Sequence, residues 1–175
     1  MIVVGDVAGH GLQAAMLVSL LVGAIRNQAD TSFDPLSLLQ SLNRRLLGRG
    51  HANATCLALC MAPDGSATLA NAGHLPPYVN GKEMSMEGAL PLGTAEDTEF
   101  AVMHFQLEPG DRLTFVSDGV VEATNEEREL FGFARTQEIS NQPAATIAAM
   151  AQKFGQEDDI TVVSVVRTAQ VMAAV

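Results

Sequence analysis

Acidic residues stand at three places in this chain where an apolar run meets a turn. They are Asp6 after the run MIVVG, Asp118 after LTFVS, and the pair Asp158 and Asp159 before ITVVSVV. A carboxylate at the end of a strand projects from a rigid sheet toward water and ligands. Several converging carboxylates repel one another unless a cation lies between them, and oxygen-only ligands suit Mg²⁺ or Mn²⁺. The pattern therefore favours a site for divalent metal ions.

Each acidic position also has an ordinary structural interpretation. Asp6 could cap a following helix, Asp118-Gly119 is a common turn sequence, and a pair of aspartates is usual in a solvated loop. A lone histidine such as His10, or His74 in the string NAGH, is more often a helix cap or a core residue than a catalytic group. Each signal is weak when taken alone, and it is their order along the chain that strengthens them.

The composition excludes several classes of partner. The chain has 175 residues, 47% of them apolar and 17% charged, which is typical of a globular domain. Its net charge of −10 argues against nucleic acid and against an anionic membrane surface. The apolar stretch over 14–25 is too short to span a bilayer, and no basic residue precedes it as in a signal peptide. Cys56 and Cys60 are too few for a disulfide framework and are predicted to be small buried thiols in a reducing cytoplasm.

The elements that must hold these aspartates follow from hydrophobic periodicity and turn residues. An apolar stretch over 12–28 predicts a buried helix, Asp34-Pro35 predicts the start of a second helix, and the β-branched run over 160–166 has the composition of a central strand. Further strands are predicted over 1–5, 54–62, 67–72, 78–79, 82–84, 99–107 and 112–117, and further helices over 35–47, 120–124, 133–139 and 143–154. Helices that group early and strands that follow predict an α+β domain with antiparallel strands.

Short motifs spread over nearly the whole chain occur together, and in the same order, in one known family. They are GDVAGHG (5–11), ATCLAL (54–59), ANAGHLPP (70–77), LPLGT (90–94), LEPGDR (107–112), VSDGVVE (116–122), LFG (130–132) and DDITVV (158–163). With them the chain resembles the bacterial metal-dependent serine/threonine phosphatases of type 2C, in the branch named for stage II sporulation protein E. The resemblance implies a central antiparallel β-sandwich flanked by helices, in α-β-β-α layers.

The resemblance also implies a binuclear site for two Mn²⁺ or Mg²⁺ ions. By motif match, Asp6 bridges both metals and the backbone carbonyl of Val7 binds one of them. Asp118 binds a metal, and Asp158 matches the last ligand of the family, with Asp159 beside it as a second candidate. These residues are the predicted catalytic and metal-binding set.

Two further groups of residues are predicted to support this site. His10, or a water at the metals, is expected to protonate the leaving serine oxygen. Glycines are expected to form the tight turns around the site because their backbone adopts conformations that other residues avoid. The glycines in question are Gly5, Gly9, Gly11, Gly73 and Gly119.

The activity that the resemblance implies is hydrolysis of phosphoserine or phosphothreonine in a protein substrate. The substrate class is the anti-anti-sigma proteins of bacterial partner-switching pathways, and the place is the cytoplasm. The sequence does not decide the oligomeric state, for which a homodimer is the candidate. The alternative is a catalytically degenerate phosphatase fold that serves as a binding or scaffold module.

One departure from the family motivates that alternative. Members begin with a further strand that carries a GDFYD-like sequence and another metal ligand, whereas this sequence starts at the next strand. We therefore expect a catalytic domain over 1–167 that is incomplete at its N-terminus, with an exposed sheet edge. The tail over 168–175 is expected to be frayed.

Overall fold

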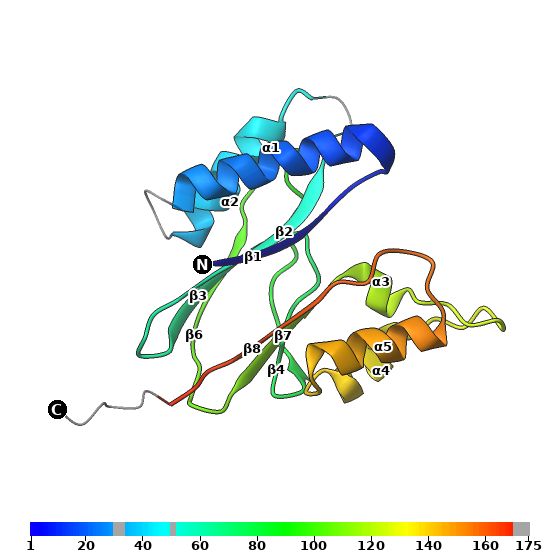
Figure 1. Ribbon diagram of the computed structural model, residues 1–175. Coiled ribbons are helices and arrows are strands. Elements are labelled where there is room, and N and C mark those ends of the chain that lie inside the picture. The colour runs from blue at the N-terminus through cyan, green and yellow to red at the C-terminus, as the bar shows by residue number, and fades with distance from the viewer. Residues whose placement is uncertain (30–33, 50–51, 170–175) are drawn as a thin grey trace. The chain divides into compact units, whose positions relative to one another are not determined.

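The computed structural model describes residues 1–29, 34–49 and 52–169. The predicted tail falls mostly outside this range. The described chain divides into two compact units, one formed by Met1–His74 and Met86–Phe105, the other by Leu75–Ser85 and the described residues from Gln106 onward. The elements are β1 (Ile2–Val7), α1 (Gly11–Ala29), α2 (Pro35–Leu46), β2 (Ala54–Met61), β3 (Ser66–Ala72), β4 (Tyr78–Val79), β5 (Lys82–Glu83), β6 (Ala101–Gln106), β7 (Arg112–Val116), α3 (Asp118–Val121), α4 (Gly132–Ile139), α5 (Ala144–Phe154) and β8 (Val162–Val166) (Figure 1).

The first unit is built on a four-stranded sheet in the order β1-β2-β3-β6. The pairs β1–β2 and β2–β3 are antiparallel, and their register places Asp6 opposite Thr55 and Cys56 opposite Ala72. Strand β1 lies at one edge of this described sheet and pairs with β2.

Helix α2 closes the core of the first unit. Four of its five leucines recur at helical spacing, so they form one stripe, and each of the four is 1% exposed or less. They pack with small residues of the sheet, among them Cys56 and Ala58 of β2. Asp34 caps the helix as predicted, with its Oδ2 accepting from the Ser37 backbone N–H at 2.9 Å. The stripe consists of Leu38, Leu39, Leu42 and Leu46.

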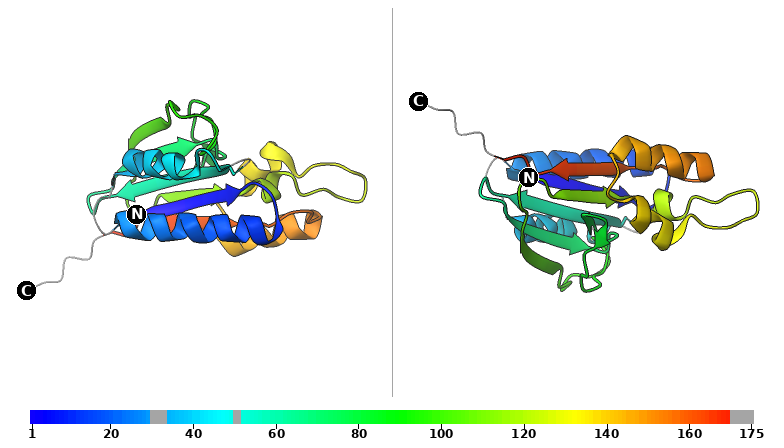
Figure 2. Two further views of the ribbon diagram at one scale, coloured as in Figure 1. Left: turned by 90° about the horizontal axis from the view of Figure 1, so that it is seen from above. Right: turned by 90° about the horizontal axis from the view of Figure 1, so that it is seen from below.

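Helix α1 corrects the prediction of a buried helix over 12–28. Only Leu21 and Ala24 of this helix are buried, whereas Leu12 is 77% and Met16 is 65% exposed. The helix lies along the β1 and α2 region (Figures 1 and 2), and its buried side joins the core of that unit. An apolar sequence indicates that a helix can be buried all round, but packing on one side leaves the opposite face open.

The second unit holds the other sheet, in the order β5-β4-β7-β8. The hairpin from β4 to β5 turns at Asn80 and Gly81, whose φ values of 51° and 83° are those that a two-residue turn requires. Strands β7 and β8 are antiparallel, with Phe115 opposite Val163. Helices α3 and α5 supply Val120, Ile147 and Ala151 to a core cluster that also contains Tyr78, Val116, Ala123 and Phe131.

Strand β8 corrects a second expectation, because its composition predicted a central strand. It stands at the edge of the described sheet and pairs with β7, and its valines are half-buried or exposed. Val162 reaches the core cluster under α5, which explains the apolar composition without a second strand partner. The predicted α+β class with antiparallel strands is confirmed. Within the described ranges, no helix combines the length and the apolar content that crossing a bilayer needs.

Candidate metal centre

Asp6 is exposed near the end of β1 and is held through its backbone. Its N–H donates to Thr55 Oγ1 at 3.3 Å, on the strand that pairs with β1. The same hydroxyl lies 2.8 Å from His74 Nδ1. A polar chain therefore connects the predicted metal ligand to a histidine 19 residues beyond Thr55.

His74 is a core histidine, as its ordinary interpretation held, and Asn71 fixes its backbone. Its N–H donates to Asn71 Oδ1 at 2.8 Å, and Asn71 Nδ2 donates to the His74 carbonyl at 2.9 Å. Asn71 is 3% and His74 is 7% exposed. Gly73, between them, has a φ of 69°, and a Cβ there would lie 2.9 Å from the Pro91 nitrogen. Sequence reasoning marked NAGH but missed Thr55 and Asn71 as supports of Asp6, because neither stands near Asp6 in the chain.

The turn after Asp6 runs from Val7 to His10. Val7 is half-buried, and the next residue, Ala8, donates its N–H to the Asn53 carbonyl at 3.1 Å. Gly9 and Gly11 have φ values of 97° and 76°, which residues other than glycine rarely adopt. This turn therefore requires glycine at both positions, as the sequence predicted. His10 is exposed. A cavity of about 840 Å³ adjoins the turn, and its polar lining includes Gln13, Arg49 and Asn53.

Asp118 belongs to the second unit and begins helix α3, which rules out the interpretation of Asp118-Gly119 as an ordinary turn. The side chain is partly exposed, and its Oδ1 accepts from the Gly119 N–H at 2.9 Å. Ser117, which precedes the helix, is 6% exposed. The carboxylate therefore stands directly beyond buried strand β7, on a helix start whose position the core fixes.

The loop with Asp158 and Asp159 packs against this helix start. Ser117 Oγ donates to the Asp159 carbonyl at 3.0 Å and accepts from the Thr161 N–H at 2.9 Å. The backbone of Asp159 lies so close to Gly119 that a Cβ there would collide with its carbonyl oxygen. The structure thus packs the backbone of this loop against the residues on either side of Asp118, and Gly119 permits the contact.

The predicted ligands divide between the two units. Asp6 and Val7 lie in the first, and Asp118, Asp158 and Asp159 lie in the second. Among the residues that the structure describes, no group of three or more His, Cys, Asp or Glu is placed to hold a metal ion. The donor chemistry of the set, carboxylates and a carbonyl, fits Mg²⁺ or Mn²⁺. The complete ligand set stays a prediction.

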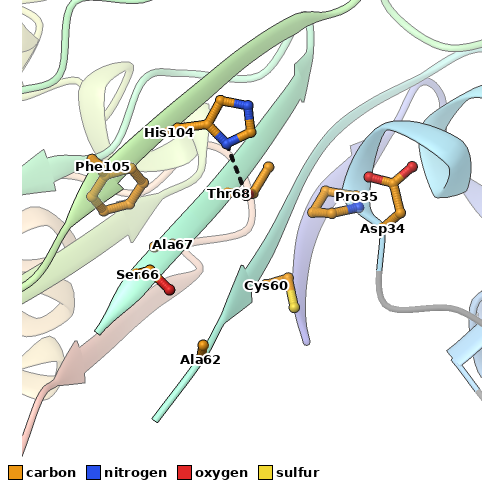
Figure 3. Close-up of a pocket in the computed structure, with 9 residues that line it drawn as sticks. All are labelled: Asp34, Pro35, Cys60, Ala62, Ser66, Ala67, Thr68, His104 and Phe105. Atoms are coloured by element: carbon orange, nitrogen blue, oxygen red, sulfur yellow. Dashed lines mark hydrogen bonds between the residues drawn. The ribbon is translucent and has the colours of Figure 1, made fainter. Parts of the chain in front are cut away.

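A second cavity in the first unit, of about 300 Å³, is unrelated to these aspartates (Figure 3). Cys60 and Thr68 face each other across β2 and β3, and Thr68 Oγ1 lies 3.0 Å from His104 Nδ1. Cys60 is five residues along β2 from Thr55, a separation of about 16 Å at the rise of a strand. This hollow therefore lies well away from Asp6.

Solved structures of type 2C phosphatase domains share this fold. The SiaA-PP2C domain of Pseudomonas aeruginosa matches with a TM-score of 0.76 and 24% identity, covering 95% of this chain and 76% of that chain. The RsbU and RsbW domains of Rv1364c from Mycobacterium tuberculosis match with a TM-score of 0.73 and 27% identity, covering 95% of this chain and 51% of that chain. The fold is that of the type 2C phosphatase domains.

The sequence comparisons agree with this class. Phosphoserine phosphatase RsbU of Bacillus subtilis (strain 168) is 28% identical over 134 residues, which are 71% of this chain and 40% of that protein. The profile of the stage II sporulation protein E family, SpoIIE, matches residues 1–168. The chain belongs to the SpoIIE family, as its motifs predicted. It spans less than half the length of the curated relative.

Proposed function

We propose that this chain is the catalytic domain of a metal-dependent protein phosphatase that hydrolyses phosphoserine or phosphothreonine. The observation that carries the proposal is the packing of the Asp158–Asp159 loop against the helix start at Asp118, in a chain of the SpoIIE family. Carboxylate oxygens, as Asp118 and Asp158 carry them, are ligands that a divalent ion such as Mg²⁺ or Mn²⁺ takes. The relative RsbU is a phosphoserine phosphatase, which supports the reaction class.

The chain's own residues would share the work as follows. Asp6, the Val7 carbonyl, Asp118 and Asp158 would hold two Mn²⁺ or Mg²⁺ ions, with Asp159 as a second candidate at the last position. When bound, such ions lower the pKa of a water and offset the negative charge of a phosphate. Thr55 keeps Asp6 in place through the hydrogen bond to its backbone.

His10 is the proposed proton donor to the leaving serine oxygen. It is exposed in the turn that follows Asp6, where a substrate can reach it. Histidine is the side chain that most often transfers a proton in enzyme catalysis.

The proposed substrate is a phosphorylated protein of the anti-anti-sigma type, acting in bacterial partner switching in the cytoplasm. The resemblance to RsbU supports this assignment. A homodimer is the oligomeric state to test, by light scattering of the eluted protein over a range of concentrations. The net charge of −10 is consistent with a protein substrate and not with nucleic acid.

The proposal is tested with p-nitrophenyl phosphate and a phosphorylated anti-anti-sigma protein in Mn²⁺, using Asp118→Asn. We expect this variant to lose about a hundredfold or more in kcat, because the charge that faces the cation is gone while the shape is kept. The matched control is Asp97→Asn, at an exposed position of the first unit, which should keep full activity. Equal activity of the Asp118 variant and the unmodified chain would refute the assignment.

A second candidate function is a binding module without activity. It is favoured by the finding that the described residues include no group of three or more metal-binding side chains. Titration calorimetry with Mn²⁺ separates the two candidates. Two tight sites support the phosphatase, whereas one weak site or none supports the binding module.

A further inference from the structure

Two large apolar side chains lie open to solvent where the segment after Asp118 returns to helix α4. Leu130 and Phe133 are each 56% exposed, the largest exposures among the large apolar residues that the structure describes in the second unit. They are three residues apart, so their Cα atoms are at most about 11 Å from each other. Burying such side chains against a partner is favourable, whereas leaving them in water gains nothing.

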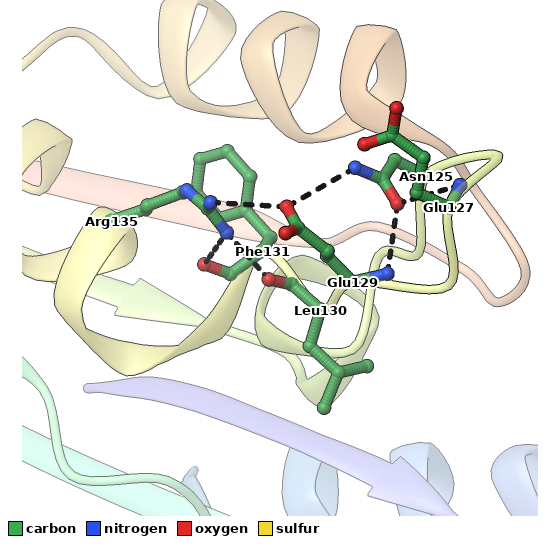
Figure 4. A network of polar contacts seen from close by, with 6 residues as sticks. All are labelled: Asn125, Glu127, Glu129, Leu130, Phe131 and Arg135. Carbon is green, nitrogen blue, oxygen red and sulfur yellow. Dashed lines mark hydrogen bonds and ion pairs between the residues drawn. The ribbon is translucent and has the colours of Figure 1, made fainter.

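The loop that presents Leu130 is held in one shape by its own polar contacts (Figure 4). Asn125 Oδ1 accepts from the N–H groups of Glu127 and Glu129 at 3.1 and 2.8 Å. The Asn125 N–H donates to the Glu129 carbonyl at 3.1 Å, and Arg128 takes a φ of 63° to close the turn. The loop therefore does not need to fold when a partner arrives.

Arg135 of α4 fastens the far end of the same loop. Its Nη1 donates to the Leu130 carbonyl at 2.7 Å, and its Nη2 lies 3.5 Å from Glu129 Oε2. The guanidinium also lies 5.0 Å from the ring centre of Phe154 on α5. Leu130 is thus anchored through its backbone while its side chain stays exposed.

The base of the loop adjoins the predicted metal ligands of the second unit. The Thr124 N–H donates to the Gly155 carbonyl at 3.0 Å, and Gln156 Nε2 donates to the Asp158 carbonyl at 3.0 Å. Thr124 stands six residues after Asp118, with α3 between them, so the two Cα atoms are within about 15 Å. A protein bound at Asp118 can therefore reach the loop.

The exposed charges around this surface are mostly negative. The loop and its approach carry four glutamates against Arg128, and Arg135 faces Glu129. A partner surface with the complementary charge is attracted, and one with the same charge is repelled. The glutamates are Glu122, Glu126, Glu127 and Glu129.

We propose that Leu130 and Phe133, with the glutamates around them, form a docking surface for the phosphoprotein substrate. The surface would take an apolar side chain flanked by lysine or arginine, presented beside the phosphoserine. The inference rests on the proposed phosphatase function and adds the substrate class that the site prefers. Because the loop is already ordered in the folded domain, the preference for this substrate does not depend on the loop folding when the substrate binds.

Two phosphoserine peptides test the surface. One carries a leucine and three lysines beside the phosphoserine, and the other carries alanine and glutamines in their place. We expect kcat/KM to be about tenfold higher for the basic peptide, and the advantage to shrink in high salt. The double variant Leu130→Ser/Phe133→Ser and the double variant Glu126→Gln/Glu127→Gln should each remove most of it.

The controls keep this test separate from the test of the phosphatase itself. Hydrolysis of p-nitrophenyl phosphate, which is too small to reach the loop, should be unchanged in both double variants. Met150→Ser, at another exposed apolar position of the second unit, should keep the peptide preference. If the unmodified chain itself does not hydrolyse p-nitrophenyl phosphate, the proposed function is overturned instead. Fluorescence anisotropy of the two labelled peptides would then decide on docking alone. Equal affinity and equal kcat/KM for both peptides would overturn the docking surface.

Discussion

At the scale of single residues, the position of Asp6 depends on a hydroxyl group from another strand. Thr55 accepts the backbone N–H of Asp6 and contacts His74, whose backbone Asn71 holds by two hydrogen bonds. A carboxylate that must meet a cation gains from such support, because a ligand that is already in place loses little freedom on binding.

Replacing Thr55 tests this support. Thr55→Val removes the hydroxyl that Asp6 and His74 share and keeps the side-chain shape, so we expect a loss of about 1–2 kcal/mol in the free energy of unfolding. Thr55→Ser keeps the hydroxyl and should restore most of the loss. Urea unfolding measures the stability, and hydrogen exchange at the Asp6 amide measures the local effect. Slower or unchanged exchange in the valine variant would contradict the assigned role.

At the scale of elements, Gly119 connects helix α3 with the loop of Asp158 and Asp159. Gly119→Ala would place a Cβ against the Asp159 carbonyl, so either the helix or the loop must shift. We expect a loss of about 1–3 kcal/mol in stability, as for other overpacked sites, together with weaker Mn²⁺ binding. Gly23→Ala is the control, because α1 leaves open space there and alanine favours a helix. If both variants unfold at the same urea concentration as the unmodified chain, the packing argument fails.

The start of helix α2 gives a second prediction at this scale. The pKa of Asp34 is lowered from its ordinary value because its side chain accepts hydrogen bonds from Ser37. The charged cap therefore stabilises the fold at pH values above about 3.8 and loses this contribution as the pH falls through the lowered value. Asp34→Ala should cost about 1 kcal/mol near neutral pH.

Asparagine at the same position separates the cap from its charge. Asp34→Asn should keep most of the stability near neutral pH, because its side-chain oxygen still accepts from the backbone. It should also reduce the acid dependence of unfolding, which thermal melts at a series of pH values below about 5 would record. An acid dependence identical to that of the unmodified chain would show that Asp34 contributes no charge effect.

At the scale of the whole molecule, each unit buries one group that resists ionisation. Burial raises the pKa of the Cys56 thiol in the first unit to about 12. Burial, with a smaller effect of Glu83, raises the pKa of Tyr78 in the second unit to about 12. Both groups ionise more easily in the unfolded chain, near 9.0 and 10.0.

This difference predicts that stability falls in alkali. The contribution of each group is fully present below its unfolded pKa and is lost as the pH rises toward about 12, with a slope of about 1.4 kcal/mol per pH unit for each group. Urea unfolding between about pH 8 and pH 11 measures the slope. Cys56→Ala and Tyr78→Phe should each flatten it by removing one titrating group, and an unchanged slope in both would contradict the prediction.

Much of the fold could be predicted because its signals are local. Asp34 and Pro35 start α2 as the cap and first-turn pattern requires, and Asn80-Gly81 turns between β4 and β5 with both residues at positive φ. The sequence also predicted buried cysteines, of which Cys56 is buried and Cys60 is intermediate. Two predictions were wrong, the burial of helix α1 and the central position of strand β8. In both, the apolar pattern predicted the type of element correctly but not how many of its faces or edges other elements cover.

The sequence alone determined the class of the protein, the type of most elements and the family. Helix caps, turns and motifs depend only on residues that are close together in the chain. Only the tertiary structure decided which distant residues meet. Thr55 reaches Asp6 from 49 residues away, and Ser117 holds the Asp159 carbonyl from 42 residues away. These contacts follow from strand register and from packing at Gly119, which depend on long-range pairing that no short stretch of sequence encodes.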